Sequence, residues 1–182
     1  MRVRSEIRVW GFASACAALF AFLVTLILCG CAGYQLGPVN GLAAGERSIQ
    51  ITPFANQTLE PRLSDPVTSQ LRKELQRDGT YKLASHGDGD IILTGSITRY
   101  DRLEVTLASN DILTVRDFRL RLTAEVVAME RTTGKTNLHQ TVIGSTLIRV
   151  GSDLTSAERQ ALPLLADDLA KNVTALLAEG KW

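Results

Sequence analysis

The chain has 182 residues, with 20 Lys or Arg against 19 Asp or Glu, so its formal net charge at pH 7 is +1. Because general nucleic-acid binders carry a strongly basic surface, we expect no nucleic-acid partner for a chain this close to neutral. Hydrophobic residues make up 45% of the sequence, which is ordinary for a globular protein and excludes little until their positions are considered.

The apolar residues are concentrated near the N-terminus. Residues 9–28 carry no charge, and all but three of them are hydrophobic. Arg2, Arg4 and Arg8, with Glu6 among them, give the preceding segment a net positive charge. A basic head followed by an apolar stretch is typical of a secretory signal.

A cysteine stands where this signal would be cut. Leu28-Cys29-Gly30-Cys31 resembles the lipobox of bacterial lipoproteins, which implies cleavage between Gly30 and Cys31 and fatty acids, palmitate among them, on Cys31. Cys29 fits less well because the bulky Leu28 precedes it. The alternative is a true membrane span, since about 20 uncharged residues can cross a bilayer. Ala32, where inner-membrane lipoproteins carry Asp, points by the same resemblance to the outer membrane.

We therefore expect three segments: a signal peptide at 1–30, a lipidated tether at 31–47 and a single domain at 48–182. Loss of the signal removes three arginines and one glutamate, and leaves 17 basic and 18 acidic residues. With Cys31 acylated, the domain has no free thiol. Disulfides and thiolate metal sites are thereby excluded, and the fold must be stabilised by its apolar core.

The domain is predicted to begin with a strand and a helix. Residues 48–52 alternate apolar and polar positions, as a short strand does. A helix follows, with Ser64 or Asp65 as its N-cap and Gly79 just after its end. Its apolar face carries Val67, Leu71 and Leu75.

Long strands follow. Four residues share one face of the first, namely Ile91, Leu93, Gly95 and Ile97. We expect Leu103, Val105 and Leu107 to continue that face. Residues 117–128 alternate cleanly, as in an antiparallel strand with one buried face. Since Leu113 and Val115 have the opposite parity, we expect a β-bulge or a bend near residues 116–117.

The chain is predicted to end in a hairpin and a second helix. Residues 132–134 are typical of a hairpin turn, and the last strand should cover about 136–150. Thr155 and Glu158 have the spacing of a capping box, and leucines at intervals of three and four predict a helix to about residue 179. Pro163 predicts a kink or a later helix start. The fold class is thus α+β, with two amphipathic helices on one face of a mostly antiparallel sheet of four to five strands.

No enzyme signature is present, and we expect no catalytic residue, no metal site and no cofactor other than the lipid on Cys31. Neither His86 nor His139 has a cysteine or carboxylate at metal-ligand spacing. Gly134-Lys135-Thr136 lacks the first glycine of a phosphate-binding loop.

One group of cations is a candidate binding site. The cations lie on neighbouring predicted strands and their turn, and they are Arg116, Arg119, Arg121, Lys135 and Arg149. Guanidinium groups suit phosphate oxygens, so a phosphorylated glycolipid is one ligand that this group predicts. The alternative is a solvated strand face, with the cations paired to Asp117 and Glu125.

Several segments together resemble the LptE family of lipopolysaccharide-assembly lipoproteins. They are the lipobox, the start at 31–36, the strand and turn at 49–58, the strand at 90–97 and the final helix. The resemblance covers nearly all of the mature chain. It implies an α+β domain that sits as a plug in the β-barrel LptD, at the periplasmic face of the outer membrane, and takes part in assembly of lipopolysaccharide at the cell surface.

A different class of lipoprotein shares part of this pattern. A strand followed by Pro-Phe-x-Asn-x-Thr and a helix also resembles lipoproteins that activate peptidoglycan synthases or build secretion pores. Such proteins tend to have a long linker after the cysteine or extra pore-forming strands, and neither is evident in 32–47.

The lipobox interpretation predicts that Cys31→Ser abolishes fatty-acid labelling, because the thiol is the acceptor of the lipid. Metabolic labelling with a radioactive fatty acid, followed by immunoprecipitation, measures this. Cys29→Ser is the matched control and should keep its label, and persistent labelling of Cys31→Ser would contradict the interpretation.

Overall fold

A computed structural model describes residues 44–180 apart from 86, 106–115 and 151–152. The signal peptide, Gly30, Cys31 and most of the tether fall outside these residues, so the predictions made for them stay predictions. None of the described helices is both long enough and apolar enough to span a membrane.

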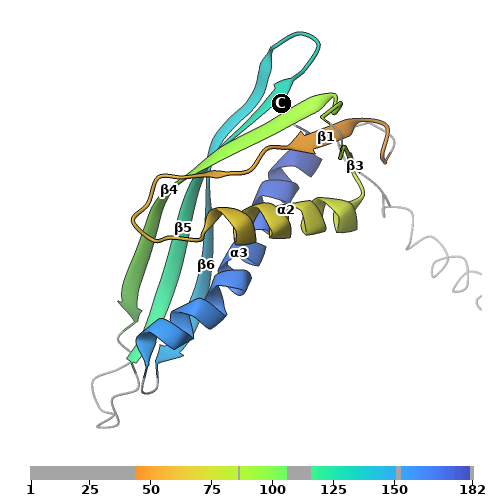
Figure 1. Cartoon of the computed structure of the whole chain (residues 1–182). Helices are drawn as coiled ribbons and strands as arrows, with labels where there is room; N and C mark the ends of the chain where they lie inside the picture. The colour runs from red at the N-terminus through yellow and green to blue at the C-terminus, as the bar shows by residue number, and fades with distance from the viewer. Residues whose placement is uncertain (1–43, 86, 106–115, 151–152, 181–182) are drawn as a thin grey trace, which may run out of the picture. The chain divides into compact units, whose positions relative to one another are not determined.

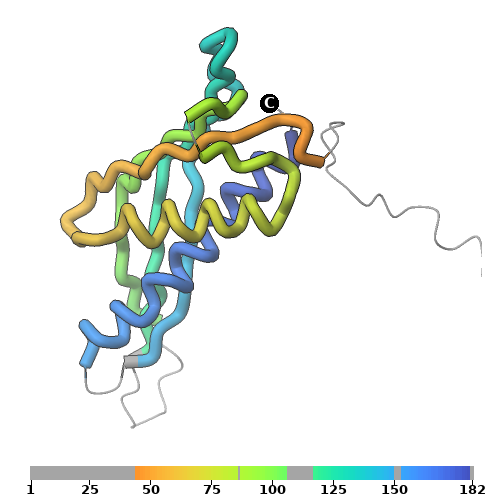
Figure 2. The backbone as a smooth tube through the Cα atoms, turned by 45° about the vertical axis from the view of Figure 1, so that its right-hand side comes forward, coloured from red at the N-terminus to blue at the C-terminus, as the bar shows by residue number. Residues whose placement is uncertain are grey.

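The described residues form six strands and two helices. In chain order they are β1 (Ser48–Ile51), β2 (Ala55–Asn56), α2 (Ser64–Asp78), β3 (Lys82–Leu83), β4 (Ile91–Val105), β5 (Arg116–Glu130), β6 (Thr136–Val150) and α3 (Leu154–Glu179). The strand order is β3-β1-β4-β5-β6, and β2 also pairs with β4. Figures 1 and 2 show both helices on the same face of the sheet. The predicted α+β class is confirmed.

The sheet is mixed and slightly larger than expected. The three long strands β4, β5 and β6 pair antiparallel, as predicted. The short strands β1, β2 and β3 pair parallel to their neighbours, because each returns to the sheet through a helix or a loop. The sheet therefore consists of three long antiparallel strands, with short parallel strands added on the β4 side.

A β-bulge in β4 changes which side chains face the helices. The register between β4 and β5 shifts between Ile97 and Arg99. One extra residue in a strand inverts the alternation beyond it, so Leu103 points away from the helices and is 40% exposed. The prediction that Leu103 and Val105 continue the face of Ile97 is therefore wrong, and Leu107 lies outside the described residues. The bulge predicted near 116–117 is also wrong, because Asp117 pairs in unbroken register with both neighbouring strands. The alternative of a bend stays a prediction, since Leu113 and Val115 lie outside the described residues.

Both helix starts differ from the predicted caps. The N-cap of α2 is Leu63, which makes no side-chain cap, so neither Ser64 nor Asp65 has that role. Its end is as predicted, because Gly79 adopts φ 75° and donates its N–H to Leu75 O. The N-cap of α3 is Asp153, whose carboxylate accepts from the N–H groups of the first turn, so the predicted capping box is wrong.

The C-terminal helix begins earlier than its proline suggested. Pro163 lies inside α3, which starts at Leu154, so the later helix start is wrong and a kink stays a prediction. The helix crosses β6 closely at Gly144, where a Cβ would lie 2.7 Å from Leu169 N. Glycine is needed there because any side chain would push the helix away from the sheet.

The core lies between the helices and the sheet. The largest fully buried side chains are Phe54, Ile49, Leu63, Leu71, Leu75, Ile91, Leu93, Ile97, Leu120, Leu122, Leu165 and Leu169. Burial of each such side chain contributes roughly 1.5–3 kcal/mol. At the outer edge of β6, Asp168 accepts from Ser145 N at 2.8 Å and Asn172 donates to Ile143 O at 2.8 Å. These contacts from α3 satisfy part of an edge that other strands could otherwise join.

Candidate functional site

The face of the sheet turned away from the helices holds two of the predicted cations between apolar side chains. Arg119 on β5 lies between Leu103 on β4 and Leu147 on β6 in the strand register. Leu147 is 62% exposed, and Ile143, two cross-strand rows away, is 47% exposed. Arg121 lies one row further along the strand, and we call these five residues the open-face patch.

Arg119 and Arg121 are available for a ligand. Among the described residues, no carboxylate lies within ion-pair distance of either guanidinium, although Asp101 is the cross-strand neighbour of Arg121. Leu103, Ile143 and Leu147 add apolar surface beside them. Cationic and apolar groups on one exposed surface suit an amphiphilic anion, such as a phosphorylated lipid.

The other predicted cations are placed differently. Arg149 pairs with Asp117 at 3.1 Å, and this hydrogen bond and the charge of Asp117 raise the pKa of Arg149. Lys135 lies in the β5–β6 turn, where its carbonyl accepts from Glu130 N, and Glu130 is roughly 36 Å along β5 from Arg119 at about 3.3 Å per residue. Arg116 is the first residue of β5.

The alternative of a paired, solvated strand face holds only in part. Asp117 does pair with an arginine of this face, but Glu125 pairs with His139 at 3.0 Å. The structure therefore separates the five predicted cations. Arg119 and Arg121 lie free in the patch, Arg149 is paired, Lys135 lies at the far end of the hairpin and Arg116 begins β5.

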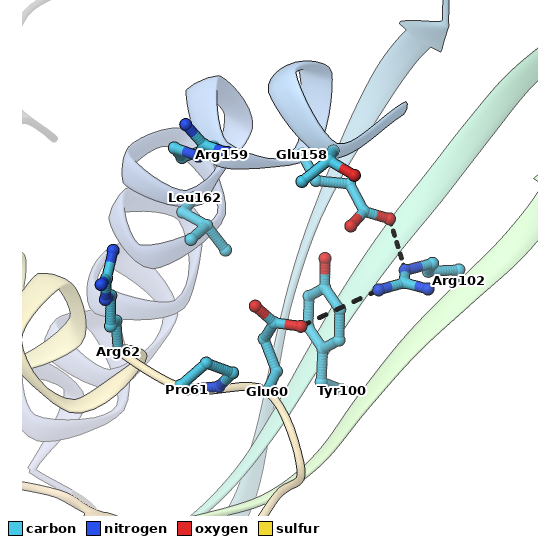
Figure 3. Close-up of a pocket in the computed structure, with 9 residues that line it drawn as sticks. Glu60, Pro61, Arg62, Tyr100, Arg102, Glu158, Arg159 and Leu162 are labelled. Atoms are coloured by element: carbon cyan, nitrogen blue, oxygen red, sulfur yellow. Dashed lines mark ion pairs between the residues drawn. The ribbon is translucent and has the colours of Figure 1, made fainter. Parts of the chain in front are cut away.

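A second surface feature lies beside β4, where the sheet ends. We call it the edge cleft: a hollow of about 370 Å³ between β4, the segment before α2 and the first turns of α3 (Figure 3). Its lining comprises Glu60, Pro61, Arg62, Tyr100, Arg102, Thr155, Glu158, Arg159 and Leu162. A second hollow of about 550 Å³ continues it along β4 and shares Glu60, Tyr100 and Arg102.

Arg102 lines the edge cleft and is held by two carboxylates. Its guanidinium pairs with Glu158 and lies 3.8 Å from Glu60 (Figure 3). It also lies 5.8 Å from the centre of the Tyr100 ring. Glu158, predicted to close a capping box, instead joins α3 to the sheet.

The Tyr100 hydroxyl is an unused hydrogen-bond donor. Its oxygen is buried and has no hydrogen-bond partner in the described part of the chain. Burial, followed by the nearby charge of Glu158, raises the pKa of Tyr100, and the Arg102 guanidinium opposes this shift. The hydroxyl therefore keeps its proton at neutral pH.

Neither surface shows a metal centre. Nowhere in the described ranges do three or more His, Cys, Asp or Glu side chains gather so as to hold a metal ion. What both surfaces offer is binding chemistry: guanidinium groups, apolar side chains and a buried hydroxyl.

The fold is shared with solved structures of low sequence identity. A putative lipoprotein from Caulobacter crescentus is 14% identical, with a TM-score of 0.50 over 71% of this chain and 87% of that one. A hypothetical protein from Chlamydia trachomatis is 9% identical, with a TM-score of 0.53 over 75% and 96%. A minor lipoprotein from Acinetobacter baumannii is 16% identical, with a TM-score of 0.48 over 72% and 92%. The first two, with TM-scores of 0.50 or more, share the α+β fold of this chain.

The family follows from the sequence. The sequence model of LptE, described as lipopolysaccharide-assembly, matches residues 46–177. Because this match covers most of the chain, the protein belongs to the LptE family, and the predicted resemblance is confirmed. No curated protein matches the chain.

Sequence reasoning missed part of both surfaces. Leu103 was assigned to the core, and Tyr100 and Arg102 were not singled out, because the bulge at Thr98 leaves no mark in the alternation of residues 91–97. The exposed Ile143 and Leu147 do share odd parity with His139, opposite to the buried Leu138 and Val142. This parity was the signal in the sequence that could have predicted the exposure of Ile143 and Leu147.

The raised pKa predicts that Tyr100 loses its proton only above the ordinary value of 10.0. Alkaline titration of phenolate absorbance, compared between the protein and its Tyr100→Phe variant, should show that the missing component titrates late. Glu158→Gln should move this component to lower pH, because it removes a negative charge that opposes ionisation. An unchanged component in Glu158→Gln would contradict the proximity of these groups.

Proposed function

We propose that this chain is an outer-membrane lipoprotein that forms a complex with the β-barrel LptD as its plug and takes part in the assembly of lipopolysaccharide at the cell surface. The observation that carries the proposal is the LptE family match over residues 46–177. The role needs binding surfaces and no reacting group, which fits a chain of a non-enzymatic family.

The open face of the sheet supports a position inside a barrel. The lumen of a large β-barrel is polar, so a plug needs polar and charged groups on the surfaces that meet it. The side chains of β5 on this face include Arg119, Arg121, Thr123 and Glu125, all at least partly exposed. The opposite face is occupied by the two helices and is not available to the barrel wall.

The attachment is part of the same proposal. Residues 1–30 would be removed, and acyl chains on Cys31 would hold the domain at the periplasmic face of the outer membrane. Since each buried methylene contributes about 0.8 kcal/mol, several acyl chains anchor a protein without a spanning helix.

We further propose that the open-face patch contacts lipopolysaccharide phosphates through Arg119 and Arg121, with Leu103, Ile143 and Leu147 against its acyl chains. Arg149 can take part only if its ion pair with Asp117 breaks. Arg116, the first residue of β5, lies next to Asp117 in the sequence. Lys135 is too far along the hairpin to share one headgroup with Arg119, so any contact that it makes is a separate one.

The complex is tested by affinity purification of the full chain from detergent-solubilised outer membranes. A large β-barrel identified as LptD should co-purify in about equal amount, and a lipoprotein of unrelated fold is the control. Recovery of a peptidoglycan synthase or secretion-pore component in place of the barrel would overturn the proposal and favour the other class of lipoprotein.

The ligand contacts are tested by Arg119→Glu with Arg121→Glu. Losing two guanidinium–phosphate contacts should weaken binding of purified lipopolysaccharide about tenfold, equivalent to about 1.4 kcal/mol. The matched control is Lys73→Glu with Lys82→Glu, which makes the same change of charge at exposed positions of α2 and β3. Equal binding by both double variants, with the barrel complex intact, would reject the contacts.

A further inference from the structure

One edge of the sheet is left open beside the edge cleft. The strand β2 leaves β4 after Asn56, where Gln57 N donates to Ile97 O at 2.9 Å. Beyond this point, from Arg99 to Val105, β4 pairs only with β5 within the described part of the chain. Figure 1 shows this half of β4 as the margin of the sheet. Every second residue of such an edge directs its N–H and C=O groups outward, where another strand can pair with them.

A rigid loop projects a leucine next to this open edge. Asn56 Oδ1 accepts from Thr58 N at 3.0 Å, and Asn56 Nδ2 donates to Glu60 O at 2.7 Å. Leu59, between these anchored residues, is fully exposed. Because the loop is already ordered by its own hydrogen bonds, burial of Leu59 against a partner costs little conformational entropy.

Three arginines at the edge cleft and its continuation form no ion pair with a carboxylate of the described residues. Arg62 and Arg159 line the hollow beneath α3, and Arg99 lines its continuation along β4. Across the described ranges, none of the three lies within ion-pair distance of a carboxylate, whereas both glutamates of the cleft are engaged by Arg102. Asp101 also lines the continuation, so the two hollows together carry four arginines against three carboxylates and keep one excess positive charge.

Arg62 is held in an unfavourable backbone conformation at this position. Its φ is 68°, in the left-handed region that residues with a Cβ seldom adopt. Arg62 lines the cleft together with its neighbour Pro61 and with Leu162 of α3 (Figure 3). The Tyr100 hydroxyl in the same cleft lacks an acceptor. A partner that carries hydrogen-bond acceptors and negative charges would therefore complement the cleft.

We propose that the edge cleft and the open edge of β4 form a docking site for an extended acidic polypeptide segment of a partner, which adds as a strand along Arg99–Val105. Its backbone pairs with β4, its carboxylates meet Arg62, Arg99 and Arg159, and an apolar side chain covers Leu59. A polypeptide is favoured over a phosphorylated lipid because only a polypeptide uses the open backbone groups. The site is distinct from the open-face patch.

The test uses the full chain in detergent and a fluorescent nine-residue peptide in which Val and Asp alternate. Fluorescence anisotropy should show saturable binding, and hydrogen exchange should slow at the amides of Arg99–Val105. Two control peptides should bind at least tenfold more weakly: one with Lys in place of Asp, and one whose backbone is N-methylated at alternate residues.

Variants locate the binding. Arg62→Glu with Arg159→Glu should weaken the acidic peptide at least tenfold, and Leu59→Ser, which changes a fully exposed side chain, should weaken it several-fold. Lys73→Glu with Lys82→Glu is the control of equal charge and should bind normally. The proposal is overturned by any of four results: no binding of the acidic peptide, equal binding of the N-methylated peptide, displacement by lipopolysaccharide, or protection of β4 through self-association without peptide.

Discussion

The register shift at Thr98 is the constraint on which both candidate surfaces depend. Up to Ile97 the alternation of β4 matches the core, and one extra residue then exchanges the two faces of the strand. Leu103 moves to the open face beside Arg119, and Tyr100 and Arg102 move to the face of α3. Without the bulge, Leu103 would be buried and Arg102 would have no route to Glu158.

The arginines divide into those that stabilise the fold through ion pairs and those that are free to bind a ligand. Arg47 pairs with Glu130, Arg149 with Asp117 and Arg102 with two glutamates, and these pairs join parts of the chain that are distant in sequence. A second set has no such partner among the described residues, and its members fall into two groups on different surfaces. They are Arg119 and Arg121 on the open face, and Arg62, Arg99 and Arg159 at the edge of β4. In a chain of near-zero net charge, this local excess is what each surface offers to a ligand.

The periodic elements could be predicted from the sequence, and the exceptions to periodicity could not. The alternation of residues 117–128 and the spacing of Leu71 and Leu75 placed a strand and a helix correctly, because burial of one face imposes the pattern. The cap of α3 was misplaced because Asp153 and Thr155 can both cap by residue type, and the cap of α2 was misplaced because Leu63 begins that helix without any side-chain cap. Glu158 illustrates this, because its spacing suits a local cap whereas its actual partner is Arg102 on β4.

The sequence by itself determined the fold class, the family and the two arginines of the open-face patch, Arg119 and Arg121. These follow from residue type and spacing, which local sequence contains. Only the tertiary structure decided which cations are free, because a pair such as Arg149 with Asp117 forms across strands whose register must first be set. It also decided that the edge of β4 is open after Ile97, since β2 departs there, and no local pattern in β4 carries that information.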